Sequence, residues 1–176
     1  MNTKLKKIVT AALFAAFACV ATMSIRIPTP GTNGYIHPGD AIVILSGVML
    51  GPVWGLLAAG IGSAMADLIG GYFLYVPITF AVKGAVAVVS GVIYKKIGRT
   101  PASRYAAVLL GGVGDILLVA GGYFLFESMI YGAAAAASIP ANIIQGISGL
   151  IISILLYPLL LKVPDFRQVV QKTGIQ

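Results

Sequence analysis

Apolar residues in this chain gather into six runs, and proline, glycine or charged residues mark the breaks between them. The first run ends before the segment 28–34, which holds two prolines and two glycines and is therefore predicted to be a loop. Proline near the start of a run fits the first turn of a helix, where its missing N–H costs nothing. We predict helices at residues 8–25, 39–50, 53–69, 77–93, 105–126 and 140–161, within a single domain that spans 1–176.

The composition places this domain in a membrane. Hydrophobic residues make up 59% of the chain and charged residues 10%, and the mean hydropathy is +0.97. A soluble domain needs far more charge to cover its surface. One crossing takes about 20 apolar residues, so the length allows at most six crossings with short loops. We therefore predict an all-α membrane protein with six transmembrane helices, of which the second is the shortest.

The basic residues predict its orientation. With a cytoplasmic N-terminus, six crossings place three basic clusters on the cytoplasmic side, as the positive-inside rule requires. This accounts for the net charge of +7 without a nucleic-acid partner. Both termini are then cytoplasmic, and the protein is a multi-pass component of the cytoplasmic membrane. The three clusters hold ten of the twelve basic residues: Lys4, Lys6 and Lys7; Lys95, Lys96, Arg99 and Arg104; and Lys162, Arg167 and Lys172.

Polar side chains lie near the outer ends of the predicted helices. Such groups cost several kcal/mol in hydrocarbon unless they are paired or face a cavity, so they are candidates for function. Asn142 and Gln145 are three residues apart and share a helix face. Two amides on one face suit the recognition of a ligand's donors and acceptors. We predict a substrate-binding layer open to the outside, formed by Asn142, Gln145, Lys83, Asp67, Tyr123, Glu127, His37 and Tyr35.

The same residues also have structural interpretations. Asp67 and Lys83 would form an ion pair that locks the third helix to the fourth. Asn142 and Gln145 would hydrogen bond between helices. His37 would either cap the second helix together with Asp40 or lie over the site as part of a lid.

Catalysis has little support in the sequence. The chain has one histidine and one cysteine, Cys19, and no Cys/His cluster of metal-ligand spacing. An intramembrane enzyme would need a reactive centre around Asp115 or His37. Asp115 lies near the midplane, where we expect it to satisfy a neighbouring helix. We predict no catalytic residue, no metal and no cofactor, and any use of ATP would need a separate subunit.

Small residues recur at four-residue spacing in the first helix. Ala11 and Ala15 form one pair, and Ala12 and Ala16 form a parallel pair. Small residues let helices approach closely in lipid. The stripe is interpreted either as packing within the bundle or as a face for another membrane protein.

Several stretches together resemble the substrate-binding S component of energy-coupling factor (ECF) vitamin transporters. The resemblance spans nearly the whole chain and keeps the order of the elements. It is closest to the branch assigned to riboflavin, hydroxymethylpyrimidine or pyridoxine uptake. The stretches are His37-Pro38-Gly39-Asp40-Ala41, Leu50-Gly51-Pro52, Gly62 to Tyr72, Pro77-Ile78-Thr79-Phe80, Lys83-Gly84, Gly122-Tyr123-Phe124 and Ile139 to Gly146.

The resemblance implies a six-helix fold in which outer loops and later helices hold a vitamin. It also implies docking, through a small-residue face on the first helix, onto a transmembrane coupling subunit that carries two ATPases. The alanine stripe matches that face in type and position. Asn142 and Gln145 match the pattern of the sixth helix and are implied to contact the ligand.

The charges of the outer layer bear on the ligand. The layer holds three acidic residues, Asp40, Asp67 and Glu127, and two basic ones, Arg26 and Lys83. It therefore has no surplus positive charge to attract a phosphate or carboxylate. A neutral or weakly basic heterocycle stacked on tyrosine fits better. Pyridoxine and hydroxymethylpyrimidine are favoured, and the larger riboflavin stays open. The alternative is a structural or assembly protein whose polar groups only hold helices together.

Overall fold

The computed structural model describes residues 3–164 and residue 166. Each of the six predicted ranges overlaps one α-helix, although α5 extends five residues beyond Phe126 and a 3₁₀-helix, η1, follows it. Two short strands stand where we predicted a loop. The elements are α1 (Thr3–Ser24), β1 (Ile27–Pro28), β2 (Tyr35–Ile36), α2 (Asp40–Leu50), α3 (Pro52–Gly70), α4 (Tyr75–Ile97), α5 (Pro101–Tyr131), η1 (Gly132–Ser138) and α6 (Ile139–Leu161).

Local sequence signals account for most helix ends. Proline lies in the first turn of α3, α5 and α6, where no intrahelical donor is lost. Thr100 and Ser103 form a reciprocal capping box at the start of α5. Gly71 ends α3 with φ of 82°, a left-handed conformation that favours glycine. These signals set the helix lengths and therefore the depths of the side chains they carry.

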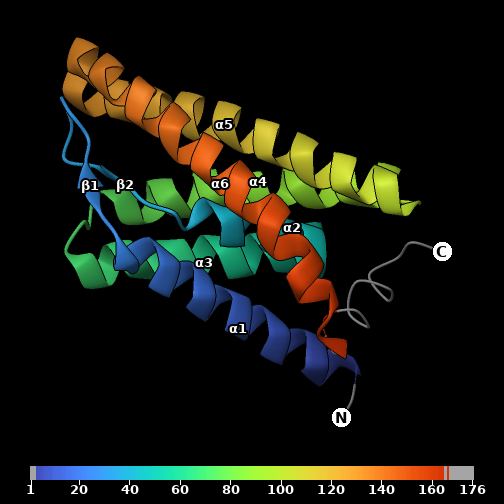
Figure 1. The fold of residues 1–176 in the computed structure, drawn as a ribbon. Coiled ribbons are helices and arrows are strands. Elements are labelled where there is room, and N and C mark those ends of the chain that lie inside the picture. The colour runs from blue at the N-terminus through green and yellow to red at the C-terminus, as the bar shows by residue number, and fades with distance from the viewer. Residues whose placement is uncertain (1–2, 165, 167–176) are drawn as a thin grey trace.

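Helix α2 lies at the centre of the bundle, as Figure 1 shows, and the longer helices surround it. It packs against α3, α4 and α6, and ten of its eleven residues are buried. A helix that is apolar all round suits such a central position. Its N-terminus follows β2 directly in the chain, at the end of the bundle where β1 and β2 lie.

The helices around α2 approach at the level of their backbones. A Cβ on Gly47 would lie 2.1 Å from the Ala87 carbonyl oxygen of α4, and one on Gly55 of α3 would lie 2.7 Å from the Gly47 Cα. Glycine is therefore required at both positions, because a side chain would push the helices apart. This close contact fixes α2 against α3 and α4.

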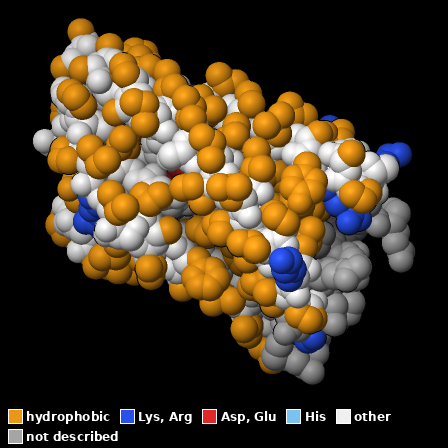
Figure 2. All heavy atoms as spheres, in the orientation of Figure 1, with side chains coloured by type: hydrophobic (Ala, Val, Ile, Leu, Met, Phe, Trp, Pro, Cys, Tyr) orange, Lys and Arg blue, Asp and Glu red, His pale blue; other side chains and the backbone are white. Residues whose placement is uncertain are grey.

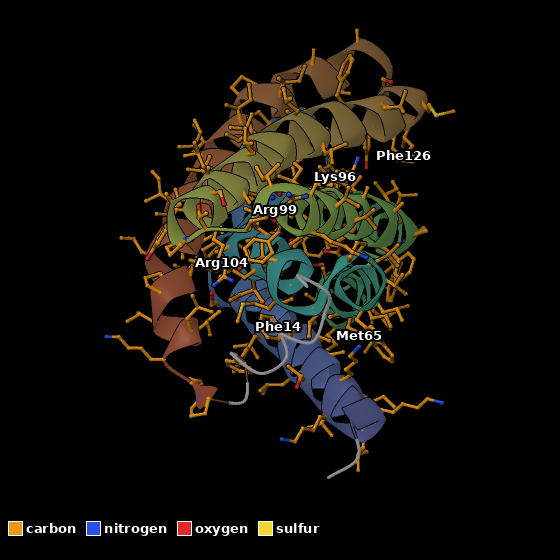
Figure 3. All side chains as sticks on the ribbon, turned by 90° about the vertical axis from the view of Figure 1, so that its right-hand side faces the viewer. Phe14, Met65, Lys96, Arg99, Arg104 and Phe126 are labelled. Atoms are coloured by element: carbon orange, nitrogen blue, oxygen red, sulfur yellow. The ribbon has the colours of Figure 1, made fainter. Side chains whose placement is uncertain are left out.

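The outer surface is suited to lipid. Large apolar side chains are exposed along α1, α3, α5 and α6, and Figure 2 shows them covering the visible face. Lys96, Arg99 and Arg104 lie at one end of the bundle, which faces the viewer in Figure 3. Within the described residues, four stretches are long and apolar enough to cross a membrane, and the last covers α5, η1 and α6 together. The protein is thus an all-α membrane protein. Arg167 and Lys172 lie outside the described residues.

Replacing Gly47 with alanine tests the central contact. We expect Gly47→Ala to lower the free energy of unfolding by about 1–3 kcal/mol, because the new methyl group overpacks the contact with α4. The measurement is thermal unfolding of the purified protein in detergent. Gly121→Ala on α5 is the matched control, since a Cβ there meets nothing within 4 Å. Equal stability of the two variants would contradict this account of the core.

Candidate functional site

The segment between α1 and α2 folds over one end of the bundle. We call residues 25–39 the lid. Its two strands pair antiparallel, with Ile27 opposite Ile36 and Pro28 opposite Tyr35. Gly31 turns the lid with φ of +76°, and a Cβ there would lie 2.4 Å from the Ala134 carbonyl oxygen of η1. Glycine therefore lets the tip of the lid lie against the backbone of η1.

A small polar cavity, which we call the inner chamber, lies under the lid. Its volume of about 20 Å³ is room for about one water molecule. The lid, α3, α4, α5 and α6 all contribute to its wall. Six of the eight predicted substrate-binding residues line it, namely Tyr35, His37, Asp67, Tyr123, Glu127 and Asn142. The remaining lining residues are Thr29, Gly34, Tyr75 and Thr79.

Glu127 is fully engaged within the wall of the chamber. The Tyr75 hydroxyl donates to its Oε1 at 2.9 Å, and the Ser138 hydroxyl donates to its Oε2 at 2.6 Å. Both donors come from other elements, so Glu127 ties α5 to the start of α4 and to the end of η1. Hydrogen bonds to a charged acceptor are the stronger kind.

Asp67 connects the lid to α3. The Tyr35 hydroxyl donates to its Oδ1 at 2.6 Å, whereas its Oδ2 has no hydrogen-bond partner among the described residues. The Arg26 guanidinium lies over the rings of Tyr35 and Tyr72, at 4.9 and 5.5 Å from their centroids. It also donates to the carbonyl oxygen of Ala66 at 3.0 Å. These contacts hold the lid against the outer end of α3.

A buried ion pair lies below the chamber. The Lys83 ammonium is 2.5 Å from Asp40 Oδ1, and both side chains are fully buried. Gln145 donates to Asp40 Oδ2 at 2.7 Å and accepts the His37 backbone N–H at 2.9 Å. Lys83 and Gln145 therefore lie in this second layer and are not part of the chamber wall. The alternative structural interpretation, an Asp67–Lys83 ion pair, is wrong, because Lys83 pairs with Asp40.

His37 is neutral in this setting. Its Nδ1 accepts the backbone N–H of Gly39 at 3.0 Å, and its side chain is buried. Burial lowers the pKa of His37 to about 3; the Asp40 carboxylate opposes this shift, and the positive charges of Lys83 and Arg26 add to it. His37 lies in the lid and lines the chamber. Asp40, which one of our two interpretations made a cap of α2, forms the ion pair instead.

Asp115 differs from the expectation. Its side chain is fully buried, but neither carboxylate oxygen has a hydrogen-bond partner among the described residues. Asp40 and Lys83 are the charged groups that act on it. The expectation that Asp115 satisfies a neighbouring helix through hydrogen bonds is wrong.

A larger open cleft lies outside the inner chamber. Its volume is about 550 Å³, and Gly34 and Tyr75 line both spaces. The lid therefore separates a chamber of one-water size from a cleft large enough for a small ligand. The cleft is lined by Pro28, Thr32, Asn33, Gly34, Gly71, Tyr72, Phe73, Leu74, Tyr75 and Tyr131.

The four alanines of α1 divide into two kinds. Ala11 is a core residue, and Ala15 lies so close to α3 that a Cβ on Gly62 would be 2.3 Å from its carbonyl oxygen. Ala12 and Ala16 are exposed. Helix packing inside the bundle thus accounts for Ala11 and Ala15, and the exposed part of the stripe is Ala12 and Ala16.

The ion pair provides a test of the second layer. We expect Lys83→Met to lower the free energy of unfolding by about 3–5 kcal/mol, because it leaves the buried Asp40 carboxylate without its countercharge. The double variant Asp40→Asn with Lys83→Met removes both charges and should recover much of that loss. Thermal unfolding in detergent measures both. If the double variant lost as much free energy of unfolding as the two single variants together, the two side chains would not depend on each other.

Comparison with known proteins identifies the family. Residues 2–162 match the family model of the S component of the ECF-type riboflavin transporter. A protein of Pyrococcus woesei from the "gap 3′ region" is 40% identical over 135 residues, covering 76% of this chain and 86% of its own. The thiamine precursor transporter HmpT of Lactococcus lactis subsp. cremoris is 26% identical over 161 residues, covering 90% of each chain.

Solved structures share the fold. The S component of a bacterial ECF transporter superposes with a TM-score of 0.70 at 22% identity, covering 91% of this chain and 98% of its own. The S component for biotin from an ECF-type ABC transporter also gives a TM-score of 0.70, at 17% identity, with 97% and 99% covered. These findings confirm the resemblance drawn from the sequence. The chain belongs to the ECF-type riboflavin transporter S component family, and it is a multi-pass membrane protein that acts as the substrate-binding subunit of a vitamin transporter.

Proposed function

We propose that this chain captures a small heterocyclic vitamin or precursor, with pyridoxine or hydroxymethylpyrimidine favoured over riboflavin. The observation that carries the proposal is the inner chamber, where buried polar and aromatic side chains from the lid and four helices converge. Such convergence of polar groups in an otherwise apolar site fits recognition of a small polar ring. The similarity to a thiamine precursor transporter supports the same choice.

The charge of the site also supports a neutral or weakly basic ligand. Asp67 and Glu127 line the inner chamber, whereas Lys83 is paired with Asp40 below it. Arg26 lies between two tyrosine rings beside the lid. No unpaired cation among the residues that line the chamber is available to bind a phosphate or a carboxylate.

The orientation in the membrane is part of the proposal. The lid lies at one end of the bundle, and Lys96, Arg99 and Arg104 lie at the other. The positive-inside rule then places the lid outside the cell and the beginning of α1 and the end of α6 in the cytoplasm. With α2 counted as a short buried segment of the bundle, this gives six helices in the cytoplasmic membrane. The substrate is captured from outside.

Delivery requires partners of the ECF module. We propose that a transmembrane coupling subunit carrying two ATPases docks on α1 through Ala12 and Ala16. Both alanines are exposed and face away from the core, so a second helix can approach this part of α1 closely. The chain itself supplies binding, and the ATPases supply the energy.

Binding by the purified chain tests the substrate proposal. We expect one compound of a vitamin panel to raise the melting temperature, because a ligand that binds only the folded state stabilises it. Asn142→Ala should abolish that rise while changing the ligand-free melting temperature little, since the one side-chain hydrogen bond of Asn142 within the described residues is long, at 3.5 Å. Ser128→Ala, which removes a hydroxyl bonded within its own helix, is the control. If no compound of the panel raised the melting temperature, capture of a vitamin by this chain alone would be refuted.

Uptake by cells tests the docking face separately. We expect Ala12→Leu with Ala16→Leu to abolish vitamin uptake and co-purification of the coupling subunit, because the larger side chains keep a partner helix away. Vitamin binding by the purified variant should stay unchanged. Ala106→Leu makes the same change at an exposed alanine of α5 and should leave uptake intact. Normal uptake by the α1 variant would assign the partner to another surface.

A further inference from the structure

Asp67 has one carboxylate oxygen without a partner. Its side chain is 3% exposed and lines the inner chamber. Tyr35 donates to Oδ1, but Oδ2 receives no hydrogen bond from any described residue. Thr79 lies beside the carboxylate, and its hydroxyl shares a 2.9 Å hydrogen bond with that of Tyr123, in which either hydroxyl can be the donor. Buried acceptors are rarely left unpaired, so Oδ2 is a position where a ligand donor would be stabilised.

Asn142 has a nearly unused amide in the same chamber. It is 4% exposed, and its side-chain contact is a 3.5 Å separation from Nδ2 to Ser138 Oγ, at the long limit for a hydrogen bond. The Ser138 hydroxyl is itself directed at Glu127 Oε2, at 2.6 Å. A carboxamide presents a donor beside an acceptor. That edge pairs in bidentate fashion with a ring nitrogen and an adjacent amino group, as asparagine does with adenine.

Several other hydrogen-bonding groups of the chamber are already in use. Glu127 accepts at both oxygens, and the Tyr35 and Tyr75 hydroxyls donate to carboxylates. His37 Nδ1 accepts the Gly39 N–H, so the proton of the neutral ring lies on Nε2 and adds a donor to the site. The Asp67 oxygen and the Asn142 amide edge together suit N–H donors next to a ring nitrogen.

We propose that the inner chamber selects an amino-substituted nitrogen heterocycle of the aminopyrimidine class, a choice that rests on the proposed function and narrows it. The ring amino group donates to Asp67 Oδ2 and to the Asn142 carbonyl oxygen, and the Asn142 amide donates to the adjacent ring nitrogen. Pyridoxine has hydroxyl groups but no amino group beside a ring nitrogen. The imide edge of riboflavin would set carbonyl oxygens against the Asp67 carboxylate.

A ring needs more room than about 20 Å³, and the neighbouring cleft supplies it. Gly34 and Tyr75 line both the inner chamber and the cleft of about 550 Å³. Because Gly34 belongs to the lid, the proposal requires the lid to shift there and so join the two spaces. The same shift leaves Asp67 and Asn142 in place, because they lie on α3 and α6.

Calorimetric titration of the full-length purified chain with hydroxymethylpyrimidine and with pyridoxine tests the selection. The wild-type chain should bind hydroxymethylpyrimidine at least about tenfold more tightly than pyridoxine, as expected for a hydrogen bond to a charged group. Asp67→Asn should lower the affinity for hydroxymethylpyrimidine by about tenfold or more and the affinity for pyridoxine much less. Asp115→Asn makes the same chemical change outside the chamber and should leave both affinities unchanged.

Equal or tighter binding of pyridoxine or riboflavin by the wild-type chain would overturn the inference and leave the proposed function standing. The inference would also be overturned if Asp67→Asn lowered the affinity for both ligands equally. If Asp67→Asn does not fold, Asn142→Asp carries the same test, because it removes the donor to the ring nitrogen and should lower the preference for hydroxymethylpyrimidine. No binding of any vitamin would instead refute the proposed function.

Discussion

The arrangement of the site depends on one buried ion pair, between Lys83 of α4 and Asp40 at the start of α2. Two charges without access to water are costly unless they are paired and hydrogen bonded. Asp40 meets this condition through Lys83 at one oxygen and Gln145 of α6 at the other. Gln145 in turn holds the backbone of His37 in the lid. The pair therefore joins α2, α4, α6 and the lid, the elements around which the chamber forms.

The position of α2 follows from the same constraint. A helix of 11 residues is short for a crossing of about 20, and its start lies below the lid. Gly47 allows α2 to lie directly against α4, which brings Asp40 to the level of Lys83. The space above the start of α2 is then filled by the lid and by the polar ends of the longer helices. A short central helix thus makes room for a site within an otherwise apolar bundle.

The sequence predicted the helices well because each apolar run is bounded by proline, glycine or charge. It missed the extension of α5 to Tyr131, because the polar pair Glu127 and Ser128 follows Phe126, whereas the helix ends at Gly132 with φ of 61°. It also missed η1, since a run of five alanines does not distinguish a 3₁₀-helix from a loop. Part of the chamber had a readable pattern, since Tyr75, Thr79 and Lys83 follow one another at four-residue steps on α4. These steps place all three on one helix face.

The sequence could not predict which side chains pair between helices. The sequence analysis considered only Asp67 as a partner for Lys83, and the packing of α2 brings Asp40 to it instead. For the same reason, the sequence could not predict which alanines of α1 are buried. Their spacing shows that small residues share a face, but it does not show on which side of α1 the helix α3 packs. Local spacing predicts which residues share a face, whereas contacts between residues 43 positions apart depend on how the helices dock.

The contacts that hold the lid are numerous but individually weak. The lid is held by the Tyr35–Asp67 hydrogen bond, the bond from His37 N–H to Gln145, and the placement of Arg26 over two tyrosine rings. A neutral hydrogen bond contributes about 0.5–1.5 kcal/mol net and one to a charged group about 1.5–3 kcal/mol, and a cation–π contact contributes about 0.5–2 kcal/mol. The total is a few kcal/mol, which binding of a small ligand can offset. Asp67 and Gln145 hold the closed lid from helices that the ion pair and the glycine contacts keep fixed. The structure thus combines a rigid polar floor with a cover whose opening costs little.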